Sequence, residues 1–426
     1  MMNGIKQTKT KIFYFSLLVI AFLSPAPYCS IKIDNTFVYW VFALAIVLLI
    51  PYVKKIYGKE NNGNNYIFVK LFLIWTLVGL VRGIFIADNY WEYKNMISGV
   101  LCCMMPAFTY VFSPQVLGKF YRLWIKYCIP AFFLFYLWFV TRGEVNFYLA
   151  PIFVLGCFLP YMPRKWKIII GVLLAFMLVA DFGARSQVIK SALALFFSLL
   201  CVFRKFISNF MLKVAHAACY LSAVILLTLG ISGTFNIFTD MSSNEGKYVE
   251  KKVVNGEVVE DDVSADTRTF IYVEVLGSAI SHNYVVFGRS LARGNDSQAF
   301  GSFNAEELKT GKYERYQNEL CHLNIFTWLG LIGAILWSLI YFRSSYLAVY
   351  RSKSYFLKLI GVFIAFHWMY GWVEDATNFD IMNITLWSAI AMGLSSQFRE
   401  MSDQDFIIWF KNIFRKNNNR QIVQDR

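Results

Sequence analysis

Two cationic side chains interrupt an apolar stretch in the middle of the chain, VADFGARSQVIKSALALFF (residues 179–197). Arg185 stands between two hydrophobic runs, and Lys190 follows five residues later inside the second run. A cation in hydrocarbon costs about 3 kcal/mol or more, so a membrane protein that keeps one generally uses it. Two interpretations are open: Arg185 binds an anion, or it lies at a helix end and extends its charged group to water.

Further ionisable side chains fall near the ends of other apolar runs or in the polar segment beside them. They are Arg82, Arg268, Arg289, Arg293, Glu319, His322 and His367. Guanidinium groups bind phosphate oxygens in pairs, so arginines that converge from different segments favour a phosphate-bearing substrate. The residue types therefore predict an anion-binding cavity, provided that the elements carrying them place them on one side of a membrane.

The composition indicates a membrane protein with many spans. Of the 426 residues, 57% are hydrophobic and only 16% are charged, which excludes an ordinary soluble domain. The net charge of +14 does not call for nucleic acid, because lysine and arginine gather in the cytoplasmic loops of multispanning proteins. The cysteines show no CxxC spacing, so we expect no disulfide and no metal cluster. No small-x-small cleavage site follows the first apolar run, which we expect to remain as a span.

Apolar runs long enough to cross a bilayer predict an all-α membrane protein with about 12 transmembrane helices. The expected spans are residues 12–30, 37–53, 67–87, 95–112, 121–140, 146–162, 167–182, 186–203, 212–234, 320–342, 356–373 and 380–397. Basic residues concentrate in alternate loops, which predicts cytoplasmic N- and C-termini. The chain thus divides into nine spans (1–234), a large extracytoplasmic loop (235–319), three spans (320–397) and a cytoplasmic amphipathic basic tail (398–426).

The extracytoplasmic loop and the tail carry local patterns of their own. VVNGEVV predicts a β-hairpin with an Asn-Gly turn, and ADTRTFIYVEVLGSAISHN predicts an amphipathic helix lying on the membrane. The tail segment DQDFIIWFKNIFRKNNNR predicts a helix bound to the inner membrane surface. On this topology the ionisable residues named above lie toward the outer face, which predicts an outward-facing, electropositive cavity. Nucleotide sugars are not supplied there, so the simplest anionic substrate is a lipid-linked phosphate or pyrophosphate.

Three segments, taken in order, resemble signatures of the O-antigen polymerase and O-antigen ligase superfamily of bacterial surface-polysaccharide enzymes, over most of the chain. The segments are GARSQVIKSALAL, DTRTFIYVEVLGSAISHNYVVFGRSLA and CHLNIFTWLGLIGAILWSLIYF. Two features depart from the family pattern. A serine replaces the second glycine of the GxG-like turn (FGRS), and His322 stands closer to the Gly-Leu-Ile-Gly centre than the histidine of ligases. The second departure favours a polymerase over a ligase.

The resemblance implies a metal-independent glycosyltransferase without a cofactor, in the bacterial inner membrane with its active site facing the periplasm. An undecaprenyl-pyrophosphate-linked glycan would be the donor, and a sugar hydroxyl of another lipid-linked repeat unit would attack it. The product would be O-antigen of lipopolysaccharide, capsule or exopolysaccharide, and a chain-length regulator protein is a further implied partner. Two alternatives remain: an O-antigen ligase that transfers the glycan to lipid A-core, and a transporter or flippase for lipid-linked oligosaccharide.

The resemblance also implies roles for individual residues. Arg185 and Arg268 match its pyrophosphate-binding arginines, with Arg289 as a third. His322 matches its histidine and is expected to be the catalytic base, with Glu319 in reserve. Further residues expected to line the cavity are Arg82, Lys190, Arg293 and His367.

Overall fold

The structure, a computed structural model, describes residues 2–33, 35–58, 63–231, 249–254, 257–262, 268–298 and 300–415. Within these ranges the protein is mainly helical, and six helices are long and apolar enough to cross a membrane. They are α1 (Met2–Leu23), α2 (Thr36–Tyr57), α3 (Ile67–Ile86), α10 (Arg185–Val202), α11 (Asn209–Ile231) and α14 (Cys321–Arg351). The prediction of a mainly helical membrane protein is confirmed, whereas the count of twelve spans stays a prediction.

The other six expected spans coincide with shorter or interrupted helices. They are α4 (Tyr90–Cys103) with η3 (Met105–Tyr110); α5 (Pro114–Ala131) with η4 (Phe132–Tyr136) and α6 (Leu137–Phe139); α7 (Asn146–Leu149) with α8 (Pro151–Gly156) and η6 (Leu159–Tyr161); α9 (Arg164–Val179); α15 (Tyr355–Tyr370); and α16 (Ile381–Leu394). Proline explains several breaks, because it removes a backbone donor and collides with the preceding turn. Pro106 lies in η3, Pro130 precedes the π-helical turn η4, and Pro151 begins α8.

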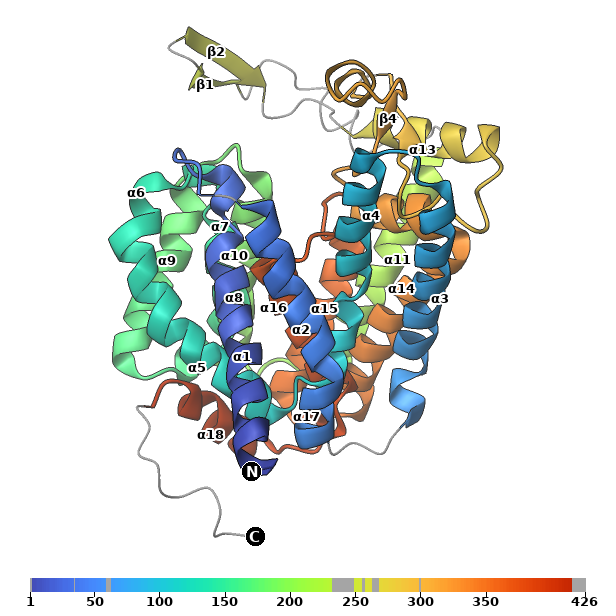
Figure 1. Cartoon of the computed structure of the whole chain (residues 1–426). Helices are drawn as coiled ribbons and strands as arrows, with labels where there is room; N and C mark the ends of the chain where they lie inside the picture. Colours follow the sequence, from blue (N-terminus) through green and yellow to red (C-terminus); the bar gives the residue numbers. More distant parts are fainter. Residues whose placement is uncertain are drawn as a thin grey trace.

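The helices form one bundle, and different short elements lie at its two ends (Figure 1). The short helix α13 (Thr269–Ser281) lies at one end, hereafter the loop end, and α18 (Asp403–Ile413) lies at the opposite end, near the start of α1. In the core, α14 packs against α3, α15 and α16. Trp337 of α14 and Trp387 of α16 are fully buried there, with ring centroids 5.1 Å apart.

Helix α14 is broken at Gly330, whose backbone angles (φ 68°, ψ −168°) are essentially restricted to glycine. The segment 285–289, which follows α13, folds back along α14 and satisfies the freed backbone groups. Leu331 N donates to Val285 O at 2.9 Å, and Arg289 N donates to Thr327 O at 2.7 Å. Such a break inside an apolar bundle is tolerated only where other protein groups make these hydrogen bonds. Segment 285–289 is therefore part of the bundle and does not lie freely outside it.

The predicted hairpin and loop helix are both present. Strands β1 (Val249–Val254) and β2 (Glu257–Asp262) pair antiparallel with Val254 opposite Glu257, and the turn residues between them lie outside the described ranges. Helix α13 buries Ile271 and Val275 against Leu320 and Leu323, while Val273 and Ile280 are exposed.

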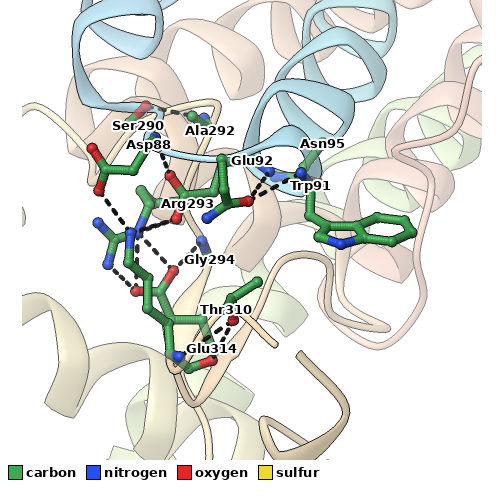
Figure 2. Close-up of polar contacts among 12 residues, drawn as sticks. Asp88, Trp91, Glu92, Asn95, Ser290, Ala292, Arg293, Gly294, Thr310 and Glu314 are labelled. Carbon is green, nitrogen blue, oxygen red and sulfur yellow. Dashed lines mark hydrogen bonds and ion pairs between the residues drawn. The ribbon is translucent and has the colours of Figure 1, made fainter. Parts of the chain in front are cut away.

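A cluster of ion pairs joins the part of the loop that follows α13 to the start of α4 (Figure 2). Short elements of the loop are β3 (Asn295–Asp296), η7 (Phe303–Glu307) and β4 (Glu314–Arg315). Lys312 Nζ lies 2.5 Å from Glu92 Oε1, and Arg293 Nε donates to Glu314 Oε2 at 2.9 Å. Glu92 is fully buried, so its charge is compensated inside the protein.

The tail helix differs from its prediction in one respect. Helix α18 forms as expected and begins with a capping box made by Ser402 and Asp405. Its apolar side, however, is covered by protein, because Phe406 and Phe410 are buried and Trp409 Nε1 donates to Pro114 O of α5 at 2.8 Å. The apolar face therefore packs on the bundle and is not available to a membrane surface.

Candidate functional site

Six segments of the chain line a cavity of about 620 Å³ at the loop end of the bundle. They are the end of η1 (Ala26–Tyr28), residues 143–147, the start of α10 with the residues before it (183–187), Arg268 before α13, residues 317–319 before α14, and the connection between α15 and α16 with the first turn of α16. The lining side chains include Glu144, Arg185, Arg268, Gln317, Glu319, Glu374, Asp375 and Asn378. We call this the arginine cavity.

The two arginines expected to bind pyrophosphate both line this cavity, although they are far apart in the sequence. Arg185 is the first residue of α10 and is exposed, and its guanidinium makes no hydrogen bond or ion pair with the residues that the structure describes. Arg268 is the N-cap residue of α13 and is partly buried. The Arg185 guanidinium is therefore available to bind a ligand. The same position also fits an arginine that only extends its charge from the helix end to water.

Carboxylates face these arginines, so the cavity is not simply electropositive as the sequence predicted. Glu319 lines the wall and accepts a hydrogen bond from Arg315 Nη2 at 3.2 Å. Asp375 accepts hydrogen bonds from Gln317 Nε2 at 2.7 Å and from Thr377 N at 2.8 Å, and burial nonetheless raises the pKa of Asp375. The arginine cavity thus contains both carboxyl and guanidinium side chains.

Glu144 is the carboxylate whose environment best suits proton transfer. Burial, and then the neighbouring charge of Asp181, raises the pKa of Glu144 to about 7. A carboxyl group with a pKa near the working pH is an effective general base or acid. No sequence pattern indicates this role, because Glu144 stands alone in a short connection and its burial depends on segments from elsewhere in the chain.

Lys190 lies beneath the arginine cavity in a buried ion pair. Its Nζ is 2.7 Å from Glu374 Oε1, and Ser186 also donates to that oxygen. Removing one member of such a pair typically costs about 3–5 kcal/mol. Lys190 and His367 line a small cavity of about 30 Å³ that shares Glu374, Asp375 and Met382 with the arginine cavity, and neither of them is among the residues that line the arginine cavity itself. Lys190 therefore holds Glu374 and Ser186 in place. Its ammonium group is not exposed in the arginine cavity.

The structure does not place His322 in the arginine cavity. The imidazole is buried, with Nε2 2.8 Å from Trp368 O and with its ring 4.4 Å from the ring of Trp372. The expectation that His322 is the catalytic base stays a prediction, but the structure does not bring its side chain to this cavity. The backbone carbonyl of Trp368 in α15 and the rings of Trp368 and Trp372 hold the imidazole, and His322 is not among the residues that line the arginine cavity.

Three other arginines named from the sequence stabilise the loop. Arg289 pairs with Asp296 (2.7 Å) and Glu314 (2.9 Å), and Arg293 pairs with Glu314, so their charges are already compensated. Arg82 donates to Phe287 O at 2.6 Å and to Gly288 O at 3.0 Å. The expectation that Arg289 is a third pyrophosphate ligand, with Arg82 and Arg293 beside it, stays a prediction, but the structure does not place these three side chains in the arginine cavity.

No family model, curated protein or solved structure matches this chain. Across the described ranges, no group of three or more histidine, cysteine, aspartate or glutamate side chains is placed to hold a metal ion. The functional interpretation accordingly rests on the geometry of the cavity.

Proposed function

We propose that the chain is a polysaccharide polymerase of the inner membrane, a metal-independent glycosyltransferase that uses a polyprenyl-pyrophosphate-linked glycan as donor. The observation that carries the proposal is the arginine cavity, in which Arg185 and Arg268 lie with Glu144, Glu319 and Asp375. In a membrane protein, a cavity with this combination at a helix end suits a substrate that is delivered by lipid and carries phosphate.

The chemistry assigns different tasks to the two kinds of side chain. Negative charge grows on the departing pyrophosphate, and the guanidinium groups of Arg185 and Arg268 stabilise it by charge and by hydrogen bonds to the phosphate oxygens. The attacking sugar hydroxyl loses its proton as the new glycosidic bond forms, and a carboxylate accepts that proton. Glu144 takes this role in the proposal in place of His322, and Glu319 and Asp375 stay as further lining carboxylates.

Purified protein in liposomes, supplied with pyrophosphate-lipid-linked repeat units, is the direct test. We expect a ladder of glycan polymers, and we expect it to form in the presence of EDTA. Dependence on added magnesium or manganese would contradict the proposed use of arginines in place of a divalent cation. Transfer only onto lipid A-core would identify a ligase, and movement of the donor between leaflets without a new bond would identify a flippase.

The proposed orientation can be tested independently by reporter fusions. Fusions after residue 60, 205 or 350 are expected to report a cytoplasmic location, because the basic loops lie there. Fusions near residue 250 or 300 are expected to report an extracytoplasmic location. A cytoplasmic signal at 250 would put the arginine cavity on the wrong side for a lipid-linked donor and would refute the proposed function.

The role of Glu144 predicts a specific pH dependence. The base is active when deprotonated, so wild-type turnover should rise with pH until it levels off above about 7. Glu144→Gln should lower turnover by about a hundredfold or more and remove this rise. His322→Ala, as a control outside the cavity, should keep the rise even if the variant is less stable. A pH profile that disappears in His322→Ala and persists in Glu144→Gln would reverse the assignment.

A further inference from the structure

A second cavity of about 300 Å³ adjoins the arginine cavity. Tyr28, Phe147, Gln317 and Asn378 line both, so the two spaces share a wall. The second cavity extends from this wall toward the start of α2 and the middle of α4, where Trp40 and Asn95 line it. We call it the aromatic cavity.

The lining of the aromatic cavity differs in chemistry from that of its neighbour. No lysine or arginine is among its described lining residues, and Asp380 is the one charged side chain there. An anionic group would therefore be unfavourable in it. Six aromatic residues contribute, namely Tyr28, Tyr39, Trp40, Phe147, Trp328 and Phe379.

Aromatic faces combined with amides suit a neutral saccharide. The C–H face of a sugar ring packs on an aromatic surface, and its hydroxyls exchange hydrogen bonds with amide groups, which both donate and accept. Tyr28 and Phe147 are stacked with their centroids 4.5 Å apart and present such a surface at the shared wall. Asn95, Gln317 and Asn378 supply the amides.

Hydrogen bonds hold these groups in position without a ligand. Gln317 Nε2 donates to Asn378 Oδ1 at 3.0 Å as well as to Asp375, and Tyr39 donates to Phe379 O at 2.8 Å. Asn95 Nδ2 donates to Leu291 O at 3.3 Å. A site whose polar groups are already fixed loses little conformational freedom on binding.

We infer that the aromatic cavity binds the terminal sugar of the acceptor glycan and presents its hydroxyl at the wall shared with the arginine cavity. This inference rests on the proposed function. The anomeric carbon of the donor is bonded to pyrophosphate and so belongs beside Arg185 and Arg268. This leaves the aromatic cavity, whose described lining residues include no lysine or arginine, to the attacking sugar. The acceptor oxygen bonds to the anomeric carbon, the bond from that carbon to the phosphate oxygen breaks, pyrophosphate leaves with the electron pair, and the hydroxyl proton passes to the carboxylate.

Two variants test the inference by opposite changes to the space inside the aromatic cavity. Ser98→Trp fills the aromatic cavity from an exposed position of α4, and Trp40→Ala removes part of its aromatic wall. Their controls are Ile97→Trp, at the neighbouring exposed position of α4, and Trp138→Ala, a highly exposed tryptophan; neither control residue lines the cavity. Membrane abundance of all four variants is compared with wild type.

The first readout is the steady-state rate of glycan transfer from the lipid-linked donor to a lipid-free repeat-unit oligosaccharide as acceptor, so that the two concentrations can be varied separately. We expect Ser98→Trp and Trp40→Ala to raise the KM for the acceptor by about tenfold or more, with the donor KM unchanged and the controls like wild type. A raised donor KM with an unchanged acceptor KM would assign the cavity to the donor glycan. Unchanged values for both substrates would show that the cavity does not bind saccharide in the reaction.

The second readout separates this inference from the proposed function. Calorimetry measures binding of the neutral repeat-unit oligosaccharide, released from the host's lipid-linked intermediates by mild acid, to purified protein. If wild type binds the oligosaccharide and Ser98→Trp binds it about tenfold more weakly, the result supports the saccharide site even when no polymer forms. Polymer formation without measurable saccharide binding, or with binding unaffected by both variants, would overturn the site and leave the proposed function standing.

Discussion

Arg185→Lys is expected to lower polymer-forming turnover by about a hundredfold, which is typical for the loss of a transition-state donor. Lysine keeps the positive charge but has no planar fork, so it cannot bind two phosphate oxygens side by side. The change should be measured as turnover in reconstituted membranes, together with binding of the pyrophosphate lipid. Arg185 is exposed at the start of α10, so the variant should accumulate at the wild-type level.

A neighbouring arginine provides the matched control for this experiment. Arg142 is exposed in the connection before α7, and its side chain does not line the arginine cavity. Arg142→Lys should therefore leave turnover and binding close to wild type. If Arg185→Lys behaves in the same way as Arg142→Lys, Arg185 is an end-of-helix residue that only extends to water, and the pyrophosphate assignment is wrong.

Gly330→Ala is expected to abolish accumulation of folded protein. A Cβ at position 330 would lie 2.3 Å from Gly288 N and from Val286 O, which are backbone atoms that cannot move aside locally. The positive φ adds about 1–3 kcal/mol of strain for any residue with a side chain. Both effects oppose the docking of segment 285–289 on α14. Folded protein can be quantified by membrane abundance and by the monodisperse fraction in detergent.

Gly171→Ala serves as the control for that substitution. Gly171 lies inside α9, and a Cβ there would meet nothing within 4 Å. The change should be neutral or stabilise the helix by up to about 1 kcal/mol. Normal accumulation of Gly330→Ala would mean that the broken form of α14 is not required for folding.

Elements with a local signal could be predicted from the sequence. The Asn-Gly pair identified the β1–β2 hairpin, and the spacing of apolar residues identified α13. Arg185 and Arg268 could be named because the segments that carry them resemble signatures of the O-antigen polymerase and O-antigen ligase superfamily. Local patterns sufficed where neighbouring residues determine the conformation.

Features that depend on distant segments could not be predicted in this way. The direction of the His322 ring is set by Trp368 and Trp372, which belong to α15 and its following turn. Charge compensation of Arg289 requires Glu314 from another part of the loop. The sequence shows where an ionisable residue stands, but only the packed structure shows whether another charge already compensates it.

The docking of segment 285–289 has a consequence for biosynthesis. Arg82 holds this segment by hydrogen bonds to the carbonyls of Phe287 and Gly288, and it is synthesised about two hundred residues before them. The backbone groups of α14 that bond to the segment are synthesised after it. The segment can reach its final position only once both helices have been inserted. Arg268 and Glu319 flank that segment in the chain, so the wall that they contribute to the arginine cavity is completed late in assembly. A partly synthesised chain therefore has no finished cavity, because the connection between α15 and α16, which also lines it, is made later still.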